Sequence, residues 1–158
     1  MSRILIFSFL IIICSCNSKP KESLLAGLWK IHSIEQQDST GNWVTADWMK
    51  NGSGYLHYDS KMNMSLHFTP ENYDTLVLPE ESDKKLWDLG ILVQLSSDYW
   101  YLGEYQVLND NTVKHTRLMH SNPEDNNRTV QRKFKFSGDT LTLSAPEFGL
   151  RLKWLKAN

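Results

Sequence analysis

The feature that most constrains the fold is a two-residue alternation of apolar and polar side chains over several short segments. In the segment 62–68, every second residue is apolar: Met62, Met64, Leu66 and Phe68. The segments 133–136, 140–144 and 148–155 alternate in the same way. Because successive side chains of a strand point to opposite faces, this period predicts strands with one buried face and not helices. The chain is therefore predicted to be mainly an antiparallel sheet.

Turn sequences separate these segments at the spacing of an antiparallel meander. They are Gly41-Asn42, Asn51-Gly52, Asp59-Ser60-Lys61, Asn109-Asp110-Asn111, Ser137-Gly138-Asp139 and Ala145-Pro146-Glu147. With 158 residues the chain is long enough for one domain and short for two. About eight strands in one domain favour an all-β fold, an antiparallel up-and-down eight-stranded barrel, because closure removes exposed strand edges.

One segment departs from the alternation. Leu86, Leu89 and Val93 recur at nearly the period of an α-helix, after an acidic start at Glu80 and Glu81. We therefore expect one helix near 80–96, which covers an open end or the outer wall of the barrel.

The N-terminus carries the pattern of a secretory signal. Residues 4–14 are apolar except for Ser8, follow Arg3, and are too few to span a bilayer. The sequence Ile13-Cys14-Ser15-Cys16 resembles a bacterial lipobox, in which Cys16 becomes the first mature residue and carries the lipid. An ordinary signal peptide cut a few residues later, after Ser18, is the alternative.

These features predict a signal peptide over 1–15, a lipidated tether over 16–23 and the barrel over 24–158. The protein is then expected in a bacterial cell envelope, anchored by its lipid to a membrane, with the outer membrane favoured. The domain would face the periplasm or the cell surface.

Charge and motifs narrow the classes of function. Lys and Arg number 17 against 18 Asp and Glu, and no basic groove accompanies the tyrosines, so no nucleic-acid partner is expected. The chain has no C-x-x-C, H-E-x-x-H, phosphate-loop or G-x-S-x-G motif, and its five histidines lack metal-ligand spacing. We therefore assign no catalytic residue, no metal and no cofactor. Both cysteines lie at or before the expected cleavage site, so the domain needs a core without a disulfide.

Six motifs in order resemble the lipocalin-like domain family of bacteria and fungi. They are Gly27-Leu28-Trp29, Gly54-Tyr55-Leu56-His57-Tyr58, Met62-Asn63-Met64-Ser65, Tyr101-Leu102-Gly103-Glu104-Tyr105, Arg132-Lys133-Phe134 and Gly138-Asp139-Thr140-Leu141-Thr142-Leu143. The resemblance covers about residues 24–156 and implies an eight-stranded lipocalin-like barrel, without implying a ligand. One departure is Asp59-Ser60-Lys61, where the family usually has a proline-glycine turn.

The strand at 112–121 carries the polar candidates for the barrel interior. Val113, His115, Arg117 and Met119 share one face, and the resemblance favours that face as the inner one; the opposite phase, with Leu118 in the core, stays open. His115 and His120 are an odd number of residues apart, so we expect them to face opposite sides. Arg132 shares a face with two phenylalanines and either contacts the ligand or lies over Trp29, as an arginine does in classical lipocalins.

Tyrosine and methionine complete the predicted pocket. Tyr101 and Tyr105 share a face with Gly103, which either leaves room in the lumen or marks strand coiling. Ordinary core packing is the alternative for each residue alone, whereas the set resembles an apolar pocket with a few polar anchors. Met62 and Met119 are further apolar lining. The predicted ligand-binding residues are Tyr58, Met64, Tyr101, Tyr105, His115, Arg117 and Arg132.

The sequence thus predicts a lipid-anchored lipocalin-like protein that binds a small apolar or amphipathic molecule in its barrel. Two alternatives stay open. The first is a barrel enzyme of isomerase, cyclase or hydrolase type, in which His115 lies within ~3 Å of an acid or a tyrosine hydroxyl and faces a cavity. The second is an interaction module with a packed barrel and a cluster of Trp43, Trp48 or Trp100 on its surface. The sequence makes no prediction of oligomeric state.

Overall fold

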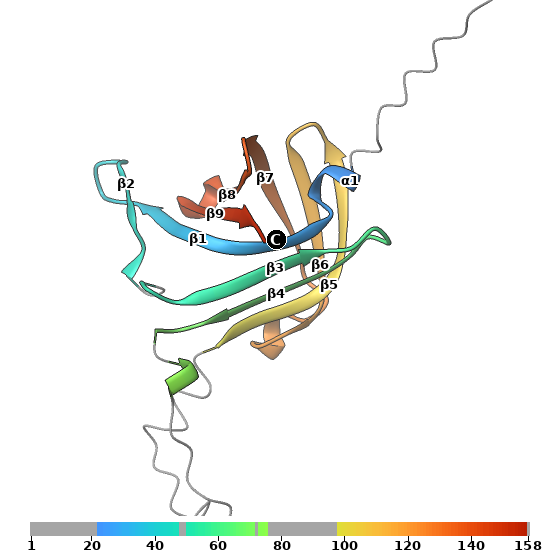
Figure 1. The fold of residues 1–158 in the computed structure, drawn as a ribbon, viewed down its shortest axis with the longest axis horizontal. Coiled ribbons are helices and arrows are strands. Elements are labelled where there is room, and N and C mark those ends of the chain that lie inside the picture. Colours follow the sequence, from blue (N-terminus) through green and yellow to red (C-terminus); the bar gives the residue numbers. More distant parts are fainter. Residues whose placement is uncertain (1–21, 48–49, 72, 76–97, 158) are drawn as a thin grey trace, which may run out of the picture.

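The computed structural model describes residues 22–47, 50–71, 73–75 and 98–157 (Figure 1). Its helical elements are α1 (Glu22–Leu25) and three short 3-10 segments, η2 (Tyr73–Thr75), η4 (Pro123–Asp125) and η5 (Pro146–Phe148). Its strands are β1 (Gly27–Gln37), β2 (Trp43–Thr45), β3 (Ser53–Tyr58), β4 (Asn63–Thr69), β5 (Tyr99–Asn109), β6 (Thr112–His120), β7 (Thr129–Ser137), β8 (Thr140–Ala145) and β9 (Leu150–Lys156). The expected helix near 80–96, the signal peptide and Cys16 lie outside the described residues.

Eight strands close into an antiparallel barrel. They follow the order β1-β3-β4-β5-β6-β7-β8-β9, and β9 pairs back with β1 (Figure 1). Each strand after β3 pairs with its predecessor in the chain, which is the up-and-down connectivity. The predicted eight-stranded barrel is confirmed. The short strand β2 pairs with the end of β1 and lies outside the ring.

Strand β1 joins the two sides of the barrel. Its first residues, Gly27 to Lys30, pair with β3, whereas Trp29 to Gln36 pair with β9. The register shifts between Ile31 and Ser33, at a bulge that bends the strand as the barrel closes.

No helix among the described residues has the length and apolar character needed to cross a membrane.

The turn between β3 and β4 is held by Asp59. Its Oδ1 accepts hydrogen bonds from the backbone N–H groups of Lys61, at 2.8 Å, and Asn63, at 2.7 Å. Its Oδ2 accepts a third from the side chain of Asn63, and this bond lowers the pKa of Asp59. An aspartate turn of this kind replaces the proline and glycine expected from the family resemblance.

One end of the barrel is covered by α1. Leu25 of this helix is fully buried, and its carbonyl oxygen accepts a hydrogen bond of 2.8 Å from Trp29 Nε1. The ammonium group of Lys156 lies 5.6 Å from the centre of the Trp29 ring. The cation near Trp29 is therefore Lys156, whereas Arg132 was one expectation. Lys156 reaches the ring because the last residues of β9 pair with the first residues of β1.

A bulge in β6 changes which of its side chains face inward. Gly103 of β5 pairs with Arg117, whereas the preceding residue Leu102 pairs with Met119, so Leu118 has no residue opposite it. A Cβ atom on Gly103 would overlap the carbonyl oxygen of Thr116. Gly103 is therefore required by the close approach of β6, which supports strand coiling over extra room in the lumen.

The phase of β6 reverses after this bulge. His115 and Arg117 are buried, as the favoured phase predicted, but Leu118 and Met119 are both exposed and His120 is buried again. The prediction that His115 and His120 face opposite sides was wrong, because the bulge adds one residue between them.

Two other residues expected on an inner face are exposed. Met62 is 47% exposed and has a φ of 68°, because it belongs to the turn before β4 and not to the strand. Phe148 is 71% exposed, because Pro146 begins the 3-10 segment η5 and the alternation of β9 starts only at Leu150. In β4 and β8 the residues predicted to face inward are buried, and Leu66 and Leu141 are examples.

Candidate functional site in the barrel

The structure places the seven predicted ligand-binding residues on the inner side of five consecutive strands. Six of them are buried, and the side chain of Arg132 is only 13% exposed. They are Tyr58 on β3, Met64 on β4, Tyr101 and Tyr105 on β5, His115 and Arg117 on β6, and Arg132 on β7. Period-two alternation brings them there, because each shares its strand face with apolar core residues.

His115 lies at the centre of a hydrogen-bonded chain. Its Nε2 is 2.7 Å from the hydroxyl of Tyr58, and its Nδ1 is 3.1 Å from the hydroxyl of Tyr101. Burial, together with the positive charges of Arg132 and Arg117, lowers the pKa of His115 to about 3. Burial raises the pKa of Tyr101 to about 12 and that of Tyr58 well above its ordinary value. These three side chains are therefore uncharged at neutral pH. One tyrosine donates to the imidazole, and the other accepts from it.

Two arginines make this interior electropositive. Arg117 lies with its guanidinium carbon 5.0 Å from the centre of the Tyr101 ring, and its Nη1 is 3.7 Å from Asp125 Oδ1. Arg132 donates to the carbonyl oxygen of Gln131 at 3.0 Å, and its Nη1 is 3.5 Å from Glu147, whose side chain is 53% exposed. The buried polar residues in the described part of the chain are threonine, histidine and arginine, without a carboxylate.

A cavity of about 60 Å³ lies in the lumen beside these groups. Its apolar wall includes Leu66, Leu143, Leu152 and Trp154, and its polar lining is Tyr101, His115 and Arg132, with part of Tyr99. Sites for drug-sized ligands have volumes of ~300–1,000 Å³. A sterol or a long-chain fatty acid therefore does not fit inside the lumen as it is packed here.

The other predicted residues lie outside this cavity. The hydroxyl of Tyr105 donates to the carbonyl oxygen of Asp59 at 2.8 Å, so it ties the lumen wall to the turn between β3 and β4. The Tyr58 ring packs against Tyr105 at 4.6 Å between centroids. Met64 is buried in the core cluster. The structure thus brings three of the seven residues to the cavity, with Tyr58 and Arg117 directly behind them.

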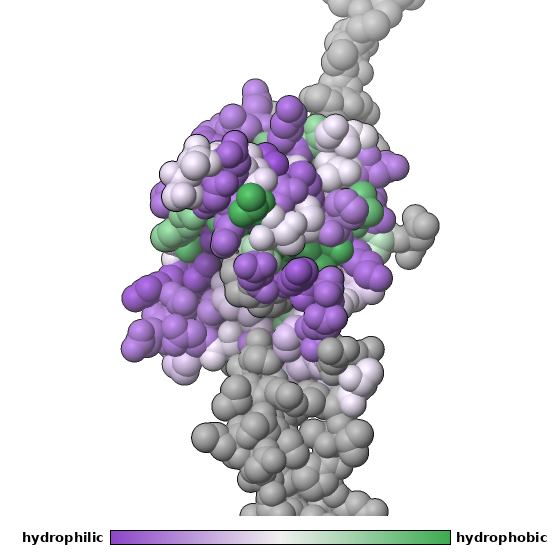
Figure 2. Space-filling model, turned by 90° about the vertical axis from the view of Figure 1, so that its left-hand side faces the viewer, coloured by the Kyte–Doolittle hydropathy of each residue, from purple (hydrophilic) through white to green (hydrophobic). Residues whose placement is uncertain are grey.

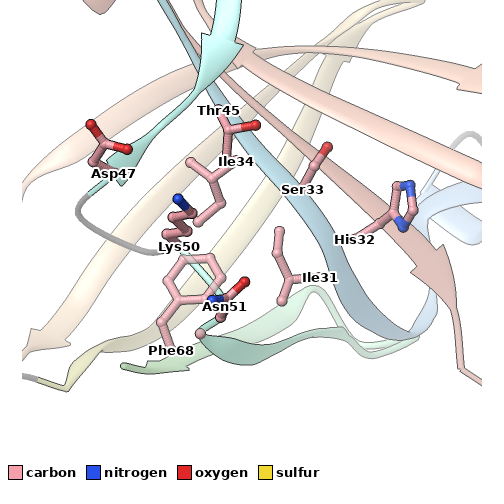
Figure 3. A pocket seen from close by; sticks show the side chains of 10 residues that line it. Ile31, His32, Ser33, Ile34, Thr45, Asp47, Lys50, Asn51 and Phe68 are labelled. Carbon is pink, nitrogen blue, oxygen red and sulfur yellow. The ribbon is translucent and has the colours of Figure 1, made fainter. Parts of the chain in front are cut away.

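A larger cleft of about 490 Å³ is lined by β1 on one side and by Thr45, Asp47 and residues 50–52 on another (Figure 3). Ile31, Ile34 and Phe68 are its apolar lining, and Asp47 and Lys50 are among its polar lining residues (Figure 3). Seen from the side of β2, the described surface of the molecule is mainly hydrophilic, with a few separate hydrophobic areas (Figure 2).

Phe68 lines both the cleft and the lumen cavity. Its ring stacks on Trp154 at 5.4 Å with an interplanar angle of 19°. It lies over Gly54 of β3, where a Cβ atom would overlap the phenyl ring. Phe68 therefore separates the two spaces. Sequence reasoning treated it as core, and Gly54 directly opposite it in the register is the signal that could have identified its position.

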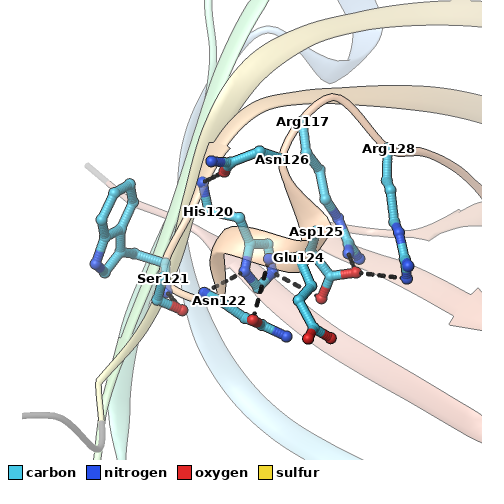
Figure 4. A network of polar contacts seen from close by, with 9 residues as sticks. Arg117, His120, Ser121, Asn122, Glu124, Asp125, Asn126 and Arg128 are labelled. Carbon is cyan, nitrogen blue, oxygen red and sulfur yellow. Dashed lines mark hydrogen bonds and ion pairs between the residues drawn. The ribbon is translucent and has the colours of Figure 1, made fainter.

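A polar cluster at the turn between β6 and β7 was also missed (Figure 4). Asp125 of η4 lies 3.0 Å from Arg128 Nη1, and its Oδ2 lies 3.9 Å from His120 Nε2. The imidazole of His120 is parallel to the ring of Tyr101, with 5.7 Å between centroids. Burial, followed by the charge of Arg117, lowers the pKa of His120. The bulge in β6 brings His120 to this position, and it connects the cluster with the lumen through Tyr101.

Neither space contains a metal-binding arrangement, since no group of three His, Cys, Asp or Glu side chains with that geometry occurs within residues 22–47, 50–71, 73–75 and 98–157.

A closed up-and-down barrel of eight strands, capped at one end and lined by a few polar side chains, defines the lipocalin-like class of binding folds. A family model described as a lipocalin-like domain matches residues 26–152, and the chain belongs to this family. Proteins of this fold generally bind small hydrophobic ligands, so the fold supports a ligand-binding barrel. A search among curated proteins found no similar sequence.

Proposed function

We propose that the barrel binds a small apolar or amphipathic molecule in its lumen. The apolar part of the ligand would pack on Leu143 and Leu152, and its polar group would face Tyr101, His115 and Arg132. The observation that supports this most strongly is the cavity itself, which combines an apolar wall with convergent polar groups. Tyr58 and Arg117 would act as positioning residues, because they contact His115 and Tyr101 and do not line the cavity.

The volume of the cavity limits the ligand. A water-sized group needs ~10–15 Å³ of such space. The lumen cavity of about 60 Å³ then has room for roughly four to six non-hydrogen atoms. A longer ligand would need Phe68 to move, which would join the lumen to the larger cleft.

The geometry favours binding over general-base catalysis by His115. His115 meets the distance expected for an enzyme, since Tyr58 lies 2.7 Å from its Nε2. Both ring nitrogens are occupied by tyrosine hydroxyls, however, and a pKa of about 3 makes the imidazole a weak base at neutral pH. The two tyrosine hydroxyls are suited to holding the imidazole of His115 in one orientation toward the cavity.

The interaction module receives less support. Trp43 lies on β2 and Trp100 on β5, with β1, β3 and β4 between them in the sheet. The guanidinium of Arg151 covers the Trp43 ring at 4.2 Å. Trp48 lies outside the described residues, and the two tryptophans that are described do not cluster.

Thermal unfolding tests ligand binding directly. We expect small amphipathic compounds to raise the melting temperature, since a ligand at a hundred times its dissociation constant adds ~2.7 kcal/mol of stability. Arg132→Gln should reduce this shift, whereas Lys135→Gln, an equal loss of charge on the exposed face of the same strand, should leave it unchanged. A library of apolar and amphipathic compounds that shifts neither protein would contradict the proposal.

We also propose that a lipid on Cys16 anchors the protein to a membrane of a bacterial cell envelope. The resemblance of Ile13-Cys14-Ser15-Cys16 to a lipobox supports this. Several acyl chains, at ~0.8 kcal/mol for each buried methylene, would hold the domain firmly. Expression of the full chain in bacteria with a radioactive fatty acid should label the protein. Cys16→Ala should abolish the label and Cys14→Ala should retain it; a labelled Cys16→Ala protein would refute the anchor.

A further inference from the structure

Within the described residues, the buried side-chain atoms without a hydrogen-bond partner are all donors. They are Arg117 Nε, Trp154 Nε1 and His120 Nε2, of which the last lies 3.9 Å from Asp125 Oδ2. Arginine and tryptophan nitrogens always donate. His120 Nδ1 accepts a hydrogen bond of 2.8 Å from the backbone N–H of Asn122, so the proton of the neutral ring is on Nε2. A buried donor without an acceptor is unfavourable, so among the described buried side chains it is acceptors that are lacking and not donors.

One of these donors belongs to a residue that lines the lumen cavity. Trp154 is completely buried, stacks on Phe68, and lines the same cavity as Arg132 and His115. Arg132 uses Nη1 for its contacts with Gln131 and Glu147, and a guanidinium has five N–H donors in all. The described part of the barrel interior contains no carboxylate that could serve both groups. An acceptor carried by a ligand would satisfy both groups.

The charge of the site selects among acceptors. Arg132 and Arg117 are partly balanced by Glu147 and Asp125, which lie toward the surface. A single negative charge in the lumen would be attracted to the guanidinium of Arg132, which lines the cavity, and to that of Arg117 behind it, in a medium of low dielectric constant. A neutral carbonyl group would accept the same hydrogen bonds without this attraction.

We infer that the ligand of the lumen is a short monocarboxylate of two to four carbons, whose carboxylate accepts from Trp154 Nε1 and the Arg132 guanidinium. Acetate, propanoate and butanoate have the roughly four to six non-hydrogen atoms that the cavity can hold. Their alkyl ends would pack on Leu66, Leu143 and Leu152. The inference rests on the proposed binding function and specifies its ligand.

Isothermal titration calorimetry of the full-length protein tests the ligand class. The probes are acetate, propanoate, butanoate and octanoate, together with butanamide and butanol, which are neutral and similar in size to butanoate. We expect butanoate to bind at least about tenfold more tightly than butanamide, since charge-assisted hydrogen bonds are about twice as strong as neutral ones. Octanoate should bind more weakly than butanoate, because its chain exceeds the cavity.

Two variants test the assigned donors. Trp154→Phe removes the indole N–H and keeps an aromatic ring, so it should weaken butanoate binding about tenfold. Trp100→Phe on the outward-facing side of β5 is the matched control and should leave the affinity unchanged. Arg132→Gln should remove the preference for butanoate over butanamide, and it serves as the test if Trp154→Phe does not fold.

The outcomes separate the inference from the function on which it rests. Binding of butanol or butanamide in preference to the carboxylates would overturn the inference and leave a ligand-binding barrel. Unchanged butanoate affinity in Trp154→Phe and Arg132→Gln would overturn the assigned site. If none of these probes binds, and the larger apolar compounds produce no thermal shift, both the inference and the proposed function fail.

Discussion

The buried imidazole of His115 should make the stability of the barrel depend on pH. In the folded protein burial, Arg132 and Arg117 lower its pKa from 6.5 to about 3. In the unfolded chain the pKa returns to its ordinary value of ~6.5. Between these values the unfolded state binds one more proton than the folded state, so the free energy of unfolding falls as the pH falls below about 6.5.

The magnitude follows from the two pKa values. Lowering the pH from about 7.5 to about 5 protonates His115 in the unfolded chain and leaves it neutral in the barrel. The linked loss of stability over this range is about 2 kcal/mol for one histidine. His120, whose pKa is also lowered by burial, adds a loss of the same sign. The range lies above the ordinary pKa values of Asp and Glu, so carboxyl groups contribute little to the slope.

Urea unfolding followed by tryptophan fluorescence measures this slope. The wild-type protein and His115→Gln are each unfolded at several pH values from about 7.5 to about 5. We expect His115→Gln to lose about 2 kcal/mol of the pH-dependent change. The cost of the substitution itself cancels, because only the slope is compared. Equal slopes in wild type and His115→Gln would refute the burial and the electrostatics described for this histidine.

Two further substitutions test the packing around the site by urea unfolding. Gly103→Ala should destabilise the barrel by about 1–3 kcal/mol or more, since its Cβ would overlap the backbone of Thr116; an unchanged unfolding midpoint would argue against the bulge in β6. Tyr58→Phe should cost about 1–3 kcal/mol, because it removes the hydroxyl that pairs with His115 Nε2. Tyr55→Phe on the outer face of the same strand should change stability by less than about 0.5 kcal/mol, and equal effects of the two tyrosine changes would contradict the hydrogen-bonded triad.

The alternation of apolar residues was sufficient to predict the barrel and most of its inner face. It placed Leu66, Leu141 and Trp154 correctly, because a strand with one buried side leaves little freedom of register. For β6 the alternation left both phases open, and the family resemblance favoured the one that places His115 and Arg117 inside, where the structure has them.

Beyond the bulge the sequence pattern fails for a physical reason. An inserted residue reverses the phase of every later side chain, and it is determined by how closely two strands approach, not by the composition of the bulged strand. Gly103 on the neighbouring strand was the visible signal, but a glycine in a strand is compatible with several roles. His120 and the polar cluster around Asp125 were missed for this reason.

The contents of the lumen were even less accessible to sequence reasoning. The cation near Trp29 turned out to be Lys156, because which side chain covers a ring depends on where two distant strands end. The volume of the cavity depends on the rotamers of about ten side chains that converge from several strands. The sequence indicated which kinds of residue face inward, and the packing determined how much space they leave.

The most direct test of the ligand site is the indole N–H signal of Trp154 in a proton–nitrogen correlation spectrum. The signal is assigned by its absence in Trp154→Phe. If the lumen holds a short carboxylate against this donor, titration with butanoate should move the signal to higher frequency in a saturable manner, as expected for a new charge-assisted hydrogen bond. The same titration should leave the signal of Trp100 in place. A Trp154 signal that stays fixed at saturating butanoate would contradict the proposal that the lumen receives this ligand.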